Sequence, residues 1–156
     1  MKIIGDIMSQ RYCLILFMKV ILLMIPASRN SIAECGDHIN KDSGILKYPA
    51  VGRGPQYPSY IDCSWVFETP GTSIVLKFTS FSIESDHDLV YIRDGKSKMS
   101  PLLGQYSGDT LPPILTTSTN KAFIHFTSDG TVSKDGFSLD WFTVDNGISL
   151  DIVISY

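Results

Sequence analysis

Hydrophobic and polar residues alternate along short segments between residues 63 and 144. The segments are 63–68 (CSWVFE), 73–81 (SIVLKFTSF), 89–95 (LVYIRDG), 122–130 (AFIHFTSDG) and 136–144 (GFSLDWFTV). A period of two residues is typical of β-strands with one buried face. Turn residues such as those at 69–72 (TPGT) separate the segments, and past Cys35 no helical period lasts three turns. The pattern predicts an all-β fold, an antiparallel β-sandwich.

The apolar positions of these segments predict the core. The side chains expected to face inward are Cys63, Trp65, Phe67, Ile74, Leu76, Phe78, Ala122, Ile124, Phe126, Phe137, Leu139 and Trp141. Proline and glycine predict loops at 52–55 (GRGP) and 111–113 (LPP). With 156 residues, 44% of them hydrophobic, the chain suits one domain with its own core.

The first part of the chain has a different pattern. Residues 13–25 (CLILFMKVILLMI) are almost all apolar, yet the run is shorter than the roughly 20 residues of a membrane span. Ser31 and Ala33 occupy the small-residue positions before a possible cleavage point. We therefore expect a secretory signal peptide at 1–33, with an uncleaved anchor as the alternative. A domain at 34–144 and a tail of uncertain structure at 145–156 follow.

Removing this leader changes the charge and the cysteine count. Residues 34–156 hold 9 Lys and Arg and 15 Asp and Glu, a formal charge of −6. An acidic domain is a poor candidate for binding nucleic acid, which requires neutralised phosphates. Cys35 and Cys63 remain as an even pair, which in an oxidising compartment predicts a disulfide. Two unpaired buried thiols are the alternative.

Acidic residues gather at predicted strand ends. Glu84 follows one strand, Asp88 opens the next, and Asp129 comes directly after the segment 122–128. Oxygen ligands without His or Cys neighbours suit Ca²⁺, and the Thr131 hydroxyl could join them. Solvated turn acids are the alternative, and for Asp86, which lies in the same stretch, that is the simpler interpretation.

The ordered motifs of residues 35–137 resemble the CUB domain, an extracellular sandwich module. The resemblance rests on Cys35-Gly36, Gly44-Ile45, 57–65 (YPSYIDCSW), 81–84 (FSIE), 88–95 (DLVYIRDG), 102–108 (LLGQYSG) and 118–137 (STNKAFIHFTSDGTVSKDGF). It implies two five-stranded antiparallel sheets in a jelly-roll-like sandwich. In the calcium-binding subset, the positions of Glu84, Asp88 and Asp129 hold Ca²⁺, and that of Tyr57 supports the site. The second disulfide that is common in the family has no counterpart, since Ser107 stands at one of its positions.

The resemblance also implies a function. In the calcium-binding subset the metal-ordered carboxylates capture a Lys or Arg side chain of an extracellular protein. Glu84, Asp88 and Asp129 would form the floor of that contact here, with Tyr91 and Ser133 at its rim. No catalytic motif appears in residues 34–156, so we expect a secreted binding module and not an enzyme. The alternatives are a calcium-independent, spermadhesin-like binder of glycans or proteins, and a fragment of a larger CUB-containing protease or receptor.

Overall fold

The computed structural model describes residues 35–50, 52 and 54–145, so the expected leader and nearly all of the expected tail lie outside it. The strands are β1 (His38–Ile39), β2 (Ser43–Tyr48), β3 (Asp62–Glu68), β4 (Ser73–Ser82), β5 (Leu89–Asp94), β6 (Leu102–Tyr106), β7 (Leu115–Thr116), β8 (Lys121–Thr127) and β9 (Gly136–Val144). The all-β prediction is confirmed, and the loops expected around 54–55 and 111–113 contain no strand. Within these described ranges, no helix has the length and apolar character needed to cross a membrane.

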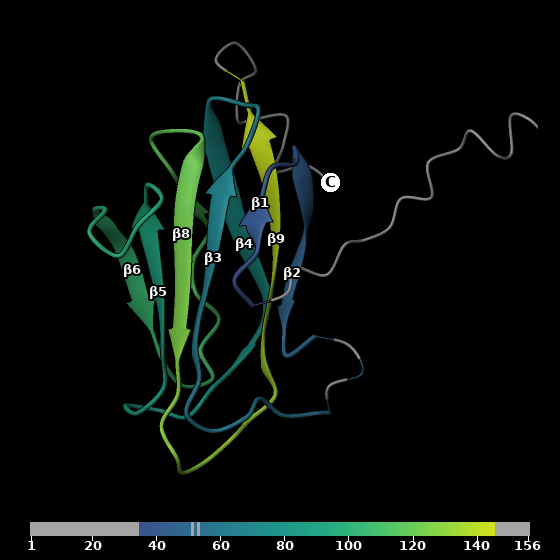
Figure 1. Cartoon of the computed structure of the whole chain (residues 1–156), viewed down its shortest axis with the longest axis vertical. Helices are drawn as coiled ribbons and strands as arrows, with labels where there is room; N and C mark the ends of the chain where they lie inside the picture. The colour runs from purple at the N-terminus through teal and green to yellow at the C-terminus, as the bar shows by residue number, and fades with distance from the viewer. Residues whose placement is uncertain (1–34, 51, 53, 146–156) are drawn as a thin grey trace, which may run out of the picture. The chain divides into compact units, whose positions relative to one another are not determined.

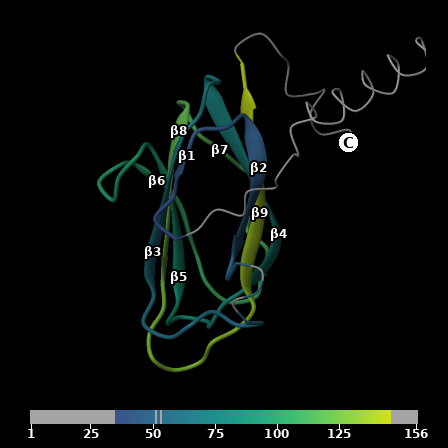
Figure 2. The ribbon, with the colours of Figure 1, turned by 45° about the vertical axis from the view of Figure 1, so that its right-hand side comes forward.

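The strands form two layers (Figures 1 and 2). One sheet has five strands in the order β1-β3-β8-β5-β6, and the other has four in the order β2-β9-β4-β7. Within the described residues, neighbouring strands pair antiparallel except β1 with β3, which pair parallel. The resemblance implied five strands in each sheet, so the second sheet is one strand smaller in the described part of the chain.

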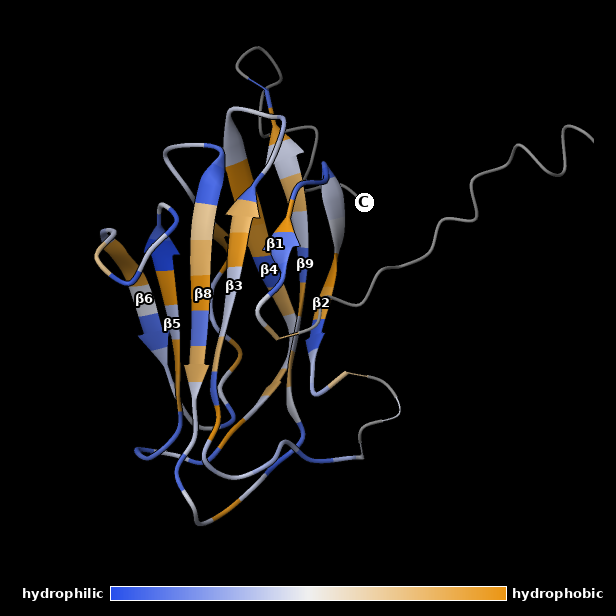
Figure 3. Cartoon of the chain, in the orientation of Figure 1, coloured by the Kyte–Doolittle hydropathy of each residue, from blue (hydrophilic) through white to orange (hydrophobic). Residues whose placement is uncertain are grey.

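The core lies between the two sheets and consists of the residues that the alternation predicted. All twelve expected inward-facing side chains are buried, and Trp65 and Phe67 are 0% exposed. Aromatic rings meet edge to face, as Trp65 does with Phe137 and Phe67 with Trp141. Apolar bands occupy much of β8, with polar bands before and within them (Figure 3). Burial of this apolar area is the main stabilising contribution to the fold.

A disulfide joins Cys35, just before β1, to Cys63 in β3, with 5.5 Å between the two Cα atoms. The prediction of a pair is therefore confirmed. Cys63 is 1% exposed, so the bridge anchors the start of the domain directly to the core.

The fold brings three connections together at one end of the sandwich. The β4–β5 and β8–β9 connections and the segment entering β3 all lie at the lower end of the molecule in Figure 1. The reason is the strand direction: β4 and β8 end there, whereas β3 and β5 begin there. The acidic residues at these strand ends can therefore meet.

Candidate metal site

Glu84, Asp88 and Asp129 meet at this end of the sandwich. One carboxylate oxygen from each lies within 4.8 Å of the other two. Calcium ligands lie about 2.3–2.6 Å from the ion, so two ligands of the same ion can be at most about 5.2 Å apart. The three oxygens meet that condition, and their hard, anionic character fits Ca²⁺. Asp88 is 1% exposed, while Glu84 and Asp129 are partly open to solvent.

Tyr57 fixes the buried carboxylate of Asp88. Its hydroxyl donates to Asp88 Oδ2 at 2.5 Å and accepts from the backbone N–H of Glu84 at 3.0 Å. Burial, followed by the hydrogen bond to Asp88, raises the pKa of the Tyr57 phenol well above its usual range. The phenol therefore stays protonated and remains a donor at any physiological pH. The backbone N–H of Asp129 donates to the other oxygen of Asp88 at 3.0 Å.

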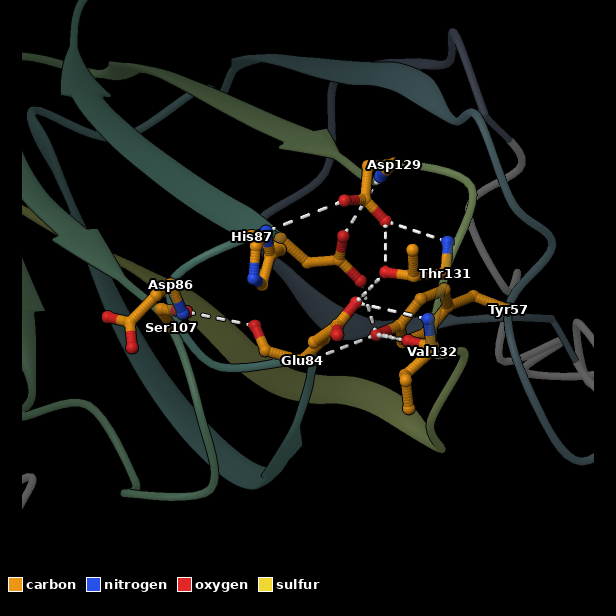
Figure 4. Close-up of polar contacts among 9 residues, drawn as sticks. Tyr57, Glu84, Asp86, His87, Ser107, Asp129, Thr131 and Val132 are labelled. Carbon is orange, nitrogen blue, oxygen red and sulfur yellow. Dashed lines mark hydrogen bonds and ion pairs between the residues drawn. The ribbon is translucent and has the colours of Figure 1, made fainter.

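Thr131 lies between the other two carboxylates (Figure 4). Its hydroxyl oxygen is 2.7 Å from Asp129 Oδ1 and 2.8 Å from Glu84 Oε2, and its N–H donates to Asp129 Oδ1 at 2.8 Å. These hydrogen bonds hold the pKa of Asp129 below its usual range, with a smaller contribution from His87, whose Nδ1 is 3.6 Å from Asp129 Oδ2. The N–H of Val132 also donates to Glu84 Oε2, at 3.1 Å.

The segment before β3 holds the loop that carries Asp129. The N–H of Tyr60 donates to the backbone oxygen of Asp129 at 2.8 Å. Ser128 accepts from the N–H of Ile61 at 3.0 Å and donates to the Pro58 carbonyl at 3.1 Å. A Cβ at Gly130 would lie 2.1 Å from the Tyr60 hydroxyl oxygen, so the two segments touch at this glycine, and a larger residue there would displace the exposed Tyr60 ring.

Apart from His87, no basic side chain of the described residues pairs with the cluster. Within the described residues, no Lys or Arg forms an ion pair with Glu84, Asp88 or Asp129, and nearby Lys134 pairs instead with Asp109 at 2.8 Å. Three carboxylates this close repel one another, and a divalent cation is the natural compensation. The donor set and its charge therefore both fit a metal ion.

Ser107 supports the loop that carries Glu84 and Asp88, a role that the sequence did not reveal. Its hydroxyl accepts from the N–H of Asp86 at 2.9 Å and donates to the backbone oxygen of Glu84 at 3.0 Å. Asp86 has a φ of 67°, which Asp tolerates better than most residues, and its carboxylate points away from the cluster (Figure 4). Two hydrogen bonds thus connect this loop to the start of the β6–β7 connection, at the position where the family's second disulfide is absent.

Replacing Ser107 by alanine is expected to loosen this loop. The Asp86 amide would lose its acceptor, so its hydrogen exchange should become about tenfold faster, and the free energy of unfolding should fall by about 1 kcal/mol. Ser85→Ala is the matched control, because within the described residues the Ser85 hydroxyl makes no hydrogen bond. Equal exchange rates in the wild type and Ser107→Ala would contradict the role of Ser107.

The two expected rim residues occupy different places. Ser133 is half-buried and follows Val132 in the loop of the cluster. Tyr91 points outward from β5, where its ring stacks on His125 with 5.8 Å between the ring centroids. Neither residue forms a hydrogen bond with the three carboxylates in the described structure. Their participation in partner binding remains a prediction.

Comparison with known proteins places the chain in a family. Residues 35–141 match the family model of the CUB domain. The "Bone morphogenetic protein 1 homolog" of Strongylocentrotus purpuratus is 39% identical over 118 residues, which is 72% of this chain and 18% of that protein. Human "Tolloid-like protein 1" is 38% identical over 109 residues, 67% of this chain and 11% of that protein. The matched region thus spans less than a fifth of either relative.

Solved structures show the same fold. The MASP-1 CUB2 domain bound to Ca²⁺ aligns with a TM-score of 0.60 at 23% identity, covering 70% of this chain and 100% of that one. The extracellular region of zebrafish Gpr126/Adgrg6 aligns with a TM-score of 0.63 at 23% identity, covering 73% of this chain and 15% of that one. The family model, the relatives and the shared sandwich agree: the chain belongs to the CUB domain family.

Proposed function

We propose that this chain is a secreted, non-enzymatic CUB module that binds Ca²⁺ and captures basic side chains of extracellular protein partners. The observation that carries this proposal is the convergence of Glu84, Asp88 and Asp129 within 4.8 Å, with no Lys or Arg of the described residues paired to them. The likeness to a CUB domain bound to Ca²⁺ gives further support. The proposal includes a secretory signal peptide at residues 1–33 and a tail at residues 145–156.

Glu84, Asp88, Asp129 and the hydroxyl of Thr131 would hold the metal ion. The ion would supply positive charge that relieves the repulsion among the carboxylates. The chain's own residues do the rest: Tyr57 keeps Asp88 in place, and the N–H groups of Thr131 and Val132 orient the other two carboxylates. The site would therefore be ordered before a partner arrives.

An ordered rim of carboxylates suits the capture of Lys or Arg. Glu84 and Asp129 remain partly open to solvent, so a cationic side chain can reach them. Charge-assisted hydrogen bonds to carboxylates are among the stronger polar contacts, and groups that are already fixed lose little entropy on binding. We infer that a partner is recognised through an exposed Lys or Arg side chain.

A capture experiment tests this function. Immobilised lysine-containing peptide should retain the protein in calcium buffer and release it when EDTA is added, while the same peptide with glutamine in place of lysine should retain little. Glu84→Gln should lower retention about tenfold. Glu68→Gln removes the same charge at the end of β3, where Glu68 pairs with Lys121, and should leave retention unchanged. If the peptide retained the protein equally in calcium buffer and in EDTA, the cluster of Glu84, Asp88 and Asp129 would not be the binding site.

A further inference from the structure

A second polar site lies on the outer face of the five-stranded sheet. A hollow of about 260 Å³ is lined by Tyr91, Arg93, Lys98, His125 and Thr127. Tyr91 and Arg93 project from β5, His125 and Thr127 project from β8, and Lys98 comes from the β5–β6 connection. The hollow is therefore bounded by two adjacent strands and by a loop that reaches back across them. Arg93 lies five residues beyond Asp88, about 16 Å along an extended strand, so the Arg93 end of the hollow is distant from the metal cluster, whereas Thr127 is two residues before Asp129.

Side chains of neighbouring strands form its floor. Tyr91 and His125 are directly opposite in the β5–β8 register, and their rings stack at an interplanar angle of 22°. The guanidinium carbon of Arg93 lies 6.0 Å from the centre of the Tyr91 ring, within range of a cation–π contact. Arg93 is thus held over an aromatic surface with its remaining donors available.

Arg93 lacks an acidic partner. Its Nη1 donates to the backbone oxygen of Ser100 at 2.9 Å, and among the described residues no carboxylate forms an ion pair with it. A guanidinium has five N–H donors in a planar fork that matches a carboxylate. A half-buried Arg with most of its donors unused and a hollow beside it is a recognition element for an anion.

The hollow's other donors already hold a carboxylate. Asp62 lies at the start of β3. Its Oδ1 accepts a hydrogen bond from Lys98 Nζ at 3.3 Å and is 2.7 Å from His125 Nε2. The hydrogen bond with His125, and then that with Lys98, holds the pKa of Asp62 below its usual range, so this group is ionised near neutral pH. Its side chain is nevertheless 69% exposed. Lys98 and His125 therefore already bind one carboxylate, that of Asp62.

We propose that this hollow is a second binding site, which takes a carboxylate side chain from an acidic segment of a partner protein. The incoming carboxylate would meet the fork of Arg93 and compete with Asp62 for Lys98. The hollow, of about 260 Å³, has room for a carboxylate side chain.

The charges favour an acidic protein segment over a sulfated polysaccharide. Polyanionic chains bind through many cations spread along a surface. Here only Arg93 and Lys98 carry a permanent positive charge among the lining residues, and Asp62 lies at the edge. One carboxylate of an acidic segment can pair with these two cations, whereas a sulfated polysaccharide would find no further permanent positive charge among the lining residues.

A blocked hexaglutamate peptide, added to the protein in EDTA so that no metal bridges the two, is the probe. Titration followed by ¹H–¹⁵N spectra should shift the amide signals of Tyr91, Arg93 and His125. Arg93→Gln should weaken binding about tenfold, because a charge-assisted pair is lost. Lys77→Gln, the matched control, removes an exposed positive charge from β4, in the other sheet, and should change affinity less than about twofold.

A second variant tests the competition directly. Asp62→Asn removes the internal carboxylate and should tighten hexaglutamate binding severalfold, whereas Asp140→Asn, on β9 of the other sheet, should have little effect. The proposal is overturned if Arg93→Gln and Lys77→Gln weaken binding equally, if Asp62→Asn and Asp140→Asn behave alike, or if a heparin-derived oligosaccharide binds at the hollow and hexaglutamate does not.

Discussion

Replacing Asp88 by asparagine is expected to lower the calcium affinity of this domain on the order of 100-fold, because affinity depends on the number of charged ligands. Asp88 is the buried member of the cluster and receives hydrogen bonds from Tyr57 and from the backbone of Asp129. Asparagine keeps the size of the side chain but removes one negative charge. Isothermal titration calorimetry with Ca²⁺ measures the change.

Asp86→Asn is the control for this experiment. It makes the same chemical change two residues away, in the same loop, where the carboxylate points away from the cluster. Asparagine also accepts the positive φ of position 86. Calcium affinity should stay within about twofold of the wild type, since only a solvent-screened charge is lost. Equal losses in the two variants would mean that the loop's total charge matters, and not ligation by Asp88.

Removing the disulfide is the second change with a large expected effect. Alanine at both Cys35 and Cys63 should lower the free energy of unfolding by about 3–4 kcal/mol, because the bridge closes a loop of about 29 residues and restricts the unfolded chain. The two positions are 28 residues apart in sequence. Urea unfolding of the double variant gives the value.

The control compares the wild type and the double variant, each with and without a reductant. A reductant that opens the bridge should destabilise the wild type to the level of the double variant, and it should leave the double variant itself unchanged. A difference below about 1 kcal/mol between wild type and double variant would contradict the chain-entropy account of the bridge.

The sequence predicted the long strands well because their inward-facing side chains recur at every second position. In β3, for example, Trp65 and Phe67 alternate with half-buried neighbours, and β9 has the same period. In β4 and β8 the alternation of burial is interrupted, because Val75 and Phe123 are buried as well. The strands β1 and β7 have two residues each, too few for any period to appear. They are strands only because Val66–Phe67 and Val75–Leu76 pair with them.

The candidate site was predictable only in part. Strand ends and the family resemblance were enough to select Glu84, Asp88 and Asp129, because antiparallel strands return to the same end of a sandwich. Ser107 was not found, since its two hydrogen bonds depend on how two separate loops are folded. The hollow was missed for a similar reason: Asp62 and Lys98 are far apart in sequence, and only the fold of the β5–β6 connection brings them together.

Calcium titration followed by thermal unfolding tests the central claim most directly. An ion bound only by the native state must raise the melting temperature as its concentration increases, by the equivalent of about 2.7 kcal/mol at 100 times the dissociation constant. We predict this rise for the wild type and its loss in Glu84→Ala. A melting temperature that does not respond to calcium, or that rises equally in both proteins, would contradict a metal site at this end of the sandwich.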